Sequence, residues 1–209
     1  MSKTTNNVVK TSAALLLAAA LLCACSSTVN FERYSLTQQS SALAKSNPFA
    51  LRLNLSPELA SGGIVMQTGP NTLVSAKEHR WAQPLENELA TLLTQSLINT
   101  FGSSAAADGQ NTTVTTGLGK AQAALSPLKI DALVTTFQGD LKGLASIDFV
   151  VTVKDEKERV LLQQEYRGQY PLQEDGYGEL CRVLQQGFMQ LSTQFAQDLK
   201  TALLSAQRR

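Results

Sequence analysis

After residue 30, hydrophobic residues either alternate with polar ones or recur at helical spacing. The alternation is regular in residues 50–55, where Leu51, Leu53 and Leu55 share one face, a pattern typical of a half-buried strand. Similar signals predict further strands at residues 31–36, 64–68, 72–75, 129–138, 143–154 and 160–170. We expect the last three to form an antiparallel meander, with the charged turn 155–158 joining the final pair.

Two segments have the helical period instead. The first begins with Pro84 in a first-turn position, has Glu86 and Glu88 near the positive end of the helix dipole, and stops at Gly102. The second covers about residues 178–204. We therefore predict the α+β class, as a single domain in which two amphipathic helices cover one face of a mostly antiparallel sheet.

Two segments lack both periods. Residues 37–47 are polar and rich in Ser and Gln, which predicts a loop. Residues 103–127 are a low-complexity stretch of Ser, Ala, Gly and Thr, interrupted by a strand candidate at residues 112–116. Its length predicts an exposed, variable excursion from the domain.

The first 24 residues have the pattern of a secretory leader. Lys3 and Lys10 give a positive end, and residues 13–22 form an unbroken apolar stretch of ten. A transmembrane helix needs about 20 apolar residues, so this stretch is too short to remain as one. We predict that residues 1–24 are a signal peptide, which is removed.

The leader ends in a segment that resembles a lipobox, the site at which bacteria attach diacylglycerol to a secreted protein. Ala24 precedes Cys25, whereas Leu22 precedes Cys23. The peptidase pocket admits only small side chains at that position. We therefore predict cleavage between Ala24 and Cys25, with Cys25 as the lipid anchor. The alternative is an ordinary cleaved leader that leaves Cys25 a plain thiol.

Anchoring at Cys25 would determine the cellular location of the protein. Ser26 follows the anchor, which resembles the pattern of Gram-negative lipoproteins sent on to the outer membrane. A triacylated cysteine would be a permanent tether, because two or more acyl chains hold stably. Residues 25–30 form a short tether, and the five residues after Cys25 reach roughly 17 Å. We expect the domain at residues 31–205 to sit close to the membrane, facing the periplasm.

Composition and charge indicate a folded domain and argue against one class of partner. Hydrophobic residues make up 43% of the chain, enough to build a core. The leader holds two of the 18 basic residues and none of the 17 acidic ones, so the mature chain has one more acidic than basic residue. We expect no nucleic-acid partner, since such proteins carry a basic face.

Candidate catalytic groups are few. His79 is the only histidine, and a polar segment containing a lone His gives a weak signal for a base or a metal ligand. Gly119-Lys120 resembles part of a phosphate loop, but the spacing of the glycines is wrong and Ala121 replaces the Ser or Thr that would hold magnesium. Asp131 and Asp148 lie in segments with a strand pattern, at positions whose side chains would face solvent. Solvent exposure is enough to explain a carboxylate at each position. We expect no catalytic site, no metal and no cofactor.

Two further residues have competing interpretations. Cys181, the one cysteine left besides the anchor, lies on the apolar stripe of the second helix, which favours a buried core residue over a nucleophile. Trp81, the only Trp, precedes the first helix. It fits either a hydrophobic staple or an exposed recognition aromatic.

Several short motifs occur together in an order that resembles a known family. They are the lipobox cysteine, Tyr-Ser-Leu at 34–36, Gly-Ile-Val-Met-Gln-Thr at 63–68, Trp-Ala-Gln-Pro-Leu at 81–85 and Asp-Gly-Tyr at 175–177. From about residue 31 to residue 204 the chain resembles the ABC-type transport auxiliary lipoproteins. Residues 103–127 depart from the family pattern.

The resemblance implies a non-catalytic accessory subunit in the outer membrane that supports membrane integrity. Its partners would be an inner-membrane protein and a periplasmic tunnel of MCE domains, which together carry lipid between the membranes, and the chain would form a homo-oligomer. Trp81, Pro84 and Tyr177 are the candidate partner contacts. One alternative is an envelope-assembly lipoprotein with no role in lipid transport. Another is a lipid-anchored periplasmic hydrolase with His79 as base.

Overall fold

The structure is a computed structural model and describes residues 31–37, 50–102, 124–125 and 128–206. The segment Glu32–Arg209 forms one compact unit. The predicted leader, Cys25, residues 38–47 of the predicted loop and the strand predicted at 112–116 lie outside the described residues.

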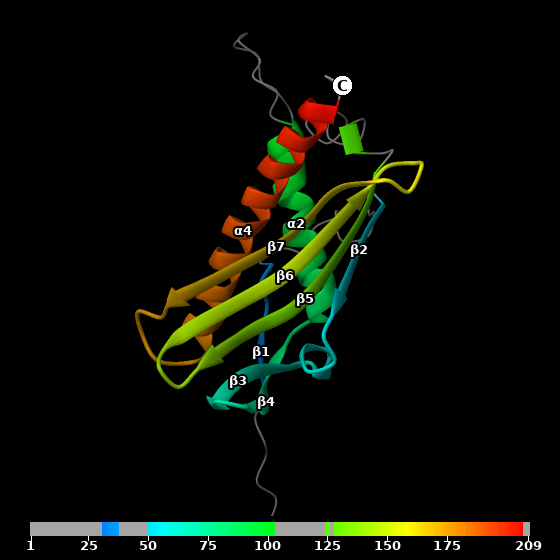
Figure 1. Cartoon of the computed structure of the whole chain (residues 1–209). Coiled ribbons are helices and arrows are strands. Elements are labelled where there is room, and N and C mark those ends of the chain that lie inside the picture. The colour runs from blue at the N-terminus through cyan, green and yellow to red at the C-terminus, as the bar shows by residue number, and fades with distance from the viewer. Residues whose placement is uncertain (1–30, 38–49, 103–123, 126–127, 207–209) are drawn as a thin grey trace, which may run out of the picture. The chain divides into compact units, whose positions relative to one another are not determined.

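A mixed sheet forms the centre of the unit (Figure 1). Within the described residues it has seven strands, which are β1 (Glu32–Tyr34), β2 (Ala50–Leu55), β3 (Gly63–Gly69), β4 (Thr72–Trp81), β5 (Lys129–Asp140), β6 (Leu144–Lys154) and β7 (Val160–Pro171). The order is β1-β4-β3-β5-β6-β7. The strand β2 pairs with the first half of β5, and β3 with its last residues. A 3-10 turn, η3 (Leu59–Ser61), lies between β2 and β3 in sequence.

Apolar residues alternate along the central strands because one face of the sheet is buried. In β6, Ile147, Phe149 and Val151 are fully buried, and the residues between them are partly exposed. In β5 the buried positions change from even to odd numbers, because the pairing with β6 shifts between Val134 and Thr136. Such a bulge turns the strand so that Phe137 still faces the core.

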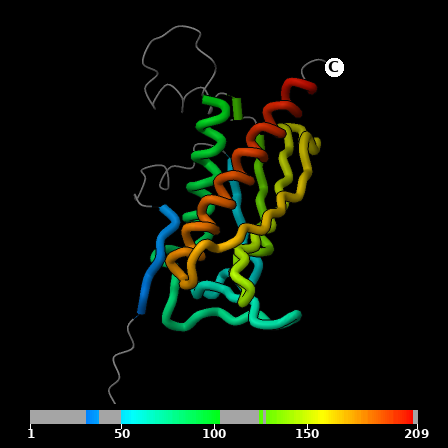
Figure 2. The backbone as a smooth tube through the Cα atoms, turned by 90° about the vertical axis from the view of Figure 1, so that its left-hand side faces the viewer, coloured from blue at the N-terminus to red at the C-terminus, as the bar shows by residue number. Residues whose placement is uncertain are grey.

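Two helices cover the buried face, α2 (Leu85–Gly102) and α4 (Tyr177–Ala206). They pack against each other, while α4 also covers β6 and β7 and α2 also contacts β2. Figure 2 shows both helices on the same side of the sheet. On the uncovered face, Arg167 pairs with Asp148 at 2.7 Å across β6 and β7. That face is therefore solvated.

Aromatic side chains join the helices to the sheet. The ring of Phe149 lies 5.2 Å from that of Phe188 and 5.3 Å from that of Tyr166, measured between ring centroids. Tyr166 in turn makes an edge contact with Phe195 at 5.8 Å. Each such pair contributes roughly 0.5–1.5 kcal/mol beyond the burial of its area. The helix α4 is therefore held along much of its length.

The α+β class, the single domain and the two covering helices are confirmed. The sheet is mixed, because β1–β4, β2–β5 and β3–β5 are parallel, whereas β3–β4 and the meander β5–β6–β7 are antiparallel. The strand β4 also continues through residues 77–80, beyond the strand predicted at 72–75. Its backbone is paired by β3 and β1, so its polar side chains can remain in solvent.

Candidate functional site

The segment that follows β1 is held by side chains from both helices. The amide of Leu36 donates to Glu88 Oε2 at 2.6 Å, and Ser35 Oγ donates to Glu88 Oε1 at 2.9 Å. The carbonyl of Leu36 accepts from Gln185 Nε2 at 2.5 Å. Because these bonds replace strand pairing, β1 ends at Tyr34, before the predicted residue 36.

Glu88 is buried, with 1% of its surface exposed. Burial raises the pKa of its carboxyl group, and the hydrogen bonds from Leu36 and Ser35 partly oppose that shift. The carboxyl group fixes the start of the domain to α2. The sequence pattern places Glu88 near the positive end of the helix dipole and does not predict this contact.

An aromatic cluster lies next to β1. His79 Nδ1 lies 3.1 Å from Tyr34 Oη, and the His79 ring stacks on Tyr177 with centroids 4.0 Å apart. Tyr34 also donates a hydrogen bond to Glu32. Burial, followed by that bond to Glu32, raises the pKa of the Tyr34 hydroxyl. The cluster therefore connects β1, β4 and the first turn of α4.

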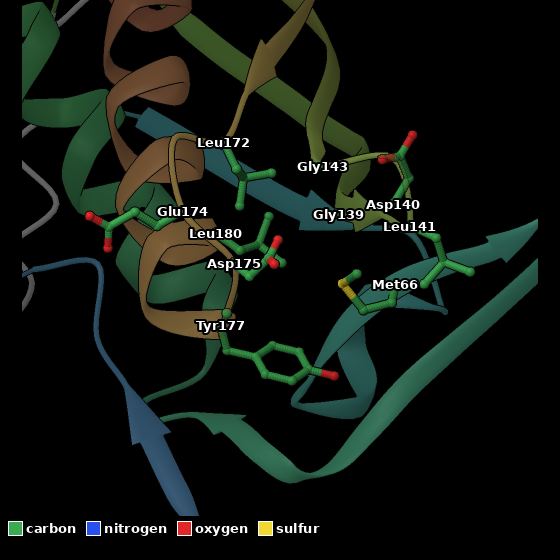
Figure 3. Close-up of a pocket in the computed structure, with 11 residues that line it drawn as sticks. Met66, Gly139, Asp140, Leu141, Gly143, Leu172, Glu174, Asp175, Tyr177 and Leu180 are labelled. Carbon is green, nitrogen blue, oxygen red and sulfur yellow. The ribbon is translucent and has the colours of Figure 1, made fainter.

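An open groove of about 280 Å³ adjoins this cluster. It is defined here by Met66, Gly139, Leu141, Leu172, Tyr177 and Leu180, and we call it the β5–α4 groove (Figure 3). Its floor depends on Gly139, since a Cβ atom there would lie 2.7 Å from Leu180 Cδ2 and 2.9 Å from Met66 Sδ. Apolar side chains dominate the lining, so the groove suits an apolar group.

The acidic residues of the groove are engaged elsewhere or lie at its rim. Asp140 Oδ1 accepts from the amides of Lys142 and Leu144 at 2.8 and 2.9 Å, which closes the β5–β6 turn. Figure 3 shows the Glu174 side chain directed away from the groove, and Asp175 beside Leu180. No hydrogen-bonded pair of nucleophile and base is found among these lining residues.

The three predicted contact residues differ in accessibility. Trp81 is 5% exposed, and its ring lies 5.8 Å from that of Phe137, so it packs in the core. Pro84 is exposed, and Tyr177 is half-buried with one side in the groove. Stacking brings Tyr177 and His79 together, whereas Pro84 directly precedes α2.

The remaining candidates occupy structural positions. Cys181 is buried, as predicted, and burial together with the nearby Glu88 raises the pKa of its thiol to about 12. Asp148 pairs with Arg167 on the uncovered face, and Asp131 lies opposite Thr152 rather than Asp148. No group of three potential metal ligands occurs among the described residues. No helix in the described part of the chain has the length and apolar character to cross a membrane.

The family of this domain follows from its match to a protein-family model. The model of the ABC-type transport auxiliary lipoprotein component matches residues 34–196. The chain belongs to this family. It is therefore a lipoprotein component of a transport system, and the resemblance drawn from the sequence motifs is confirmed. Membership of the family also makes it a membrane-anchored protein of the cell envelope.

Two solved structures share the fold of this chain. A crystal structure of an uncharacterized protein has a TM-score of 0.61 at 20% identity, covering 81% of this chain and 98% of that one. Protein XCC0632 from Xanthomonas campestris, of family-model DUF330, has a TM-score of 0.55 at 20% identity, with coverage of 75% and 85%. The search of curated proteins finds no match.

The sequence did contain a signal for Glu88. It lies three residues after Leu85 and four before Leu92, within the apolar stripe of α2. A carboxylate in such a stripe is rarely buried without a partner. The β5–α4 groove has no comparable signal, because its residues come from β3, β5, the β5–β6 turn, the β7–α4 connection and α4, which are separate in the sequence.

Proposed function

We propose that this chain is an outer-membrane lipoprotein and a non-catalytic accessory subunit of an MCE-type intermembrane lipid transport system. It docks the periplasmic tunnel of MCE domains at the outer membrane and supports membrane integrity. The observation that carries the proposal is the family match over residues 34–196, together with the lipobox-like segment that ends at Cys25. An inner-membrane protein of the same system is the second partner.

The way in which the chain enters the domain supports this role. The segment after β1 is bonded to α2 through Glu88 and to α4 through Gln185. A force on the tether would first act on β1, which pairs with β4, and the bonds at Leu36 would hold the chain beyond that strand to both helices. Anchorage confines the domain to the membrane surface and raises its effective concentration for partners that reach the same surface.

Partner contact is proposed at Pro84 and Tyr177, with Trp81 supporting them from the core. Pro84 is exposed at the start of α2, and Tyr177 offers an aromatic ring with a polar tip. Partly exposed aromatic side chains are enriched at protein interfaces. Copies of the chain assembled as a ring would present these residues repeatedly around the end of the tunnel.

Crosslinking in intact cells, followed by purification of the lipoprotein from membranes, tests the partnership. We expect an MCE-domain protein to be recovered, and its yield to fall for Tyr177→Ala. Gln173→Ala, an exposed change in the connection that precedes α4, is the matched control and should leave the yield unchanged. Consistent absence of an MCE-domain protein, or recovery of a complex without lipid, would favour an envelope-assembly lipoprotein instead.

The mass of the mature amino terminus tests the anchor. We expect the chain to begin at Cys25 and to carry three acyl chains. Cys25→Ala should abolish function while the domain remains folded by circular dichroism. Full complementation by a soluble Cys25→Ala form, exported through a cleavable leader, would show that anchorage is not required.

A further inference from the structure

Exposed apolar side chains gather at one end of the sheet. Leu141 in the β5–β6 turn is 73% exposed, and Leu73 and Val74 at the start of β4 are each 47% exposed. We call these three residues the apolar tip. The other exposed large apolar residues in the described part of the chain are Phe31 before β1, Leu133 within β5, Val160 at the opposite end of the sheet, and Met189 and Leu204 on α4.

The strand register makes the apolar tip continuous with the β5–α4 groove. Val74 lies beside Met66, and Met66 lies beside Gly139, so these residues form a row across β4, β3 and β5. Leu141 follows shortly after Gly139 and lines the groove together with Met66, as Figure 3 shows. Adjacent strands are about 4.8 Å apart, so the row spans only roughly 10 Å.

The start of β1 points toward the same end. The strand β1 is parallel to β4, with Glu32 beside His79 and Tyr34 beside Trp81. The amino end of β1 is therefore directed toward the first residues of β4, which belong to the apolar tip. Only residues 26–30 separate Cys25 from Phe31, a reach of roughly 17 Å.

We propose that the apolar tip contacts the lipid bilayer that holds Cys25, with the β5–α4 groove opening onto the membrane surface. This inference rests on the proposed anchor. An exposed leucine on a turn gains free energy at the boundary of headgroups and acyl chains. The neighbouring Lys142 is exposed and suits an anionic headgroup, because its apolar stem can lie along the leucine. The groove then lies where an apolar part of a lipid can enter it.

Tryptophan fluorescence of the mature, acylated full chain in vesicles tests the contact. The probe is a vesicle of phosphatidylethanolamine and phosphatidylglycerol with brominated phosphatidylcholine, whose bromine atoms quench nearby indoles. Leu141→Trp and Leu73→Trp report on the apolar tip, and Val160→Trp is the matched control, 53% exposed at the opposite end. The contribution of Trp81 is subtracted with the unsubstituted protein.

We expect bromolipid to lower the emission of both tip variants roughly twofold, as for a side chain at the headgroup boundary, and to leave Val160→Trp unchanged. Two tip positions are used so that one poorly folded variant leaves the other informative. Equal emission with and without bromine at the tip, or equal quenching at all three positions, overturns the inference. A third outcome also overturns the inference: bromolipid does not quench the tip variants, and an added partner protein shields the tip. That outcome assigns the surface to the partner protein.

The same samples separate this inference from the proposed function. Their mass shows whether Cys25 is acylated. An unacylated chain contradicts the anchor, whereas an acylated chain with an unquenched tip contradicts the membrane contact alone.

Discussion

Glu88 shows how one buried carboxyl group can fix the start of a domain. Replacing it by Ala leaves the Leu36 amide without its acceptor. An unsatisfied buried donor costs about 1–3 kcal/mol. We expect urea unfolding of Glu88→Ala to show a loss of that size. Glu86→Ala, an exposed change in the same helical turn, is the control and should stay within about 0.5 kcal/mol of the parent.

The raised pKa of Glu88 also predicts a pH dependence. The folded state binds this proton more tightly than the unfolded state, so the group's contribution to stability is greatest below its ordinary pKa of 4.5. That contribution is lost as the pH rises through the raised value. Glu88→Gln removes the titration, so its stability relative to the parent should increase with pH above about 4.5. A relative stability that increases toward low pH would contradict the assignment.

Cys181 should behave as an inert core residue. Its pKa of about 12 leaves almost no thiolate at neutral pH, and its side chain is buried. We expect a maleimide to modify the folded, soluble Cys25→Ala form, freed of its leader and therefore of Cys23, slowly at pH 8 and to modify it rapidly in urea. Rapid modification without denaturant would show that the start of α4 opens.

At the scale of elements, Gly187 sets how closely α4 approaches the sheet. A Cβ atom there would lie 2.4 Å from Tyr170 Cε2 and 2.9 Å from Ile147 Cδ1. We expect Gly187→Ala to lower the free energy of unfolding by about 1–3 kcal/mol, as overpacked sites do. Gly178→Ala, where a Cβ atom meets no neighbour within 4 Å, should be neutral or slightly stabilising. Equal stability of the two variants in urea would contradict the close packing of α4.

At the scale of the molecule, one hydrophobic core includes residues from both helices and from the central strands. A shared core predicts that helices and sheet unfold in a single cooperative transition. Fluorescence of Trp81, which packs on Phe137, should therefore change at the same urea concentration as the helical circular dichroism signal. Two separate midpoints would show that the β3–β4 region unfolds independently.

The sequence by itself determined the elements that carry a strong period. The Leu51-Leu53-Leu55 alternation predicted β2, and the helical period over about residues 178–204 predicted α4, because one face of each element must be buried. The family could also be recognised, since its motifs are local and keep their order. The position of Cys181 in the core followed from the apolar stripe of the same helix.

Only the tertiary structure decided how these elements combine. The parallel pairings of β1, β2 and β3 depend on strands that are distant in sequence, which no local period specifies. Residues 77–80 are polar yet belong to a strand, because β1 pairs with His79 and Arg80 and β3 pairs with Arg80. The Glu88 contact and the β5–α4 groove likewise join segments that are distant in sequence, and the pattern of one segment does not predict its contact with another. Long-range packing created them, so the sequence pattern could place their residues on elements but could not bring them together.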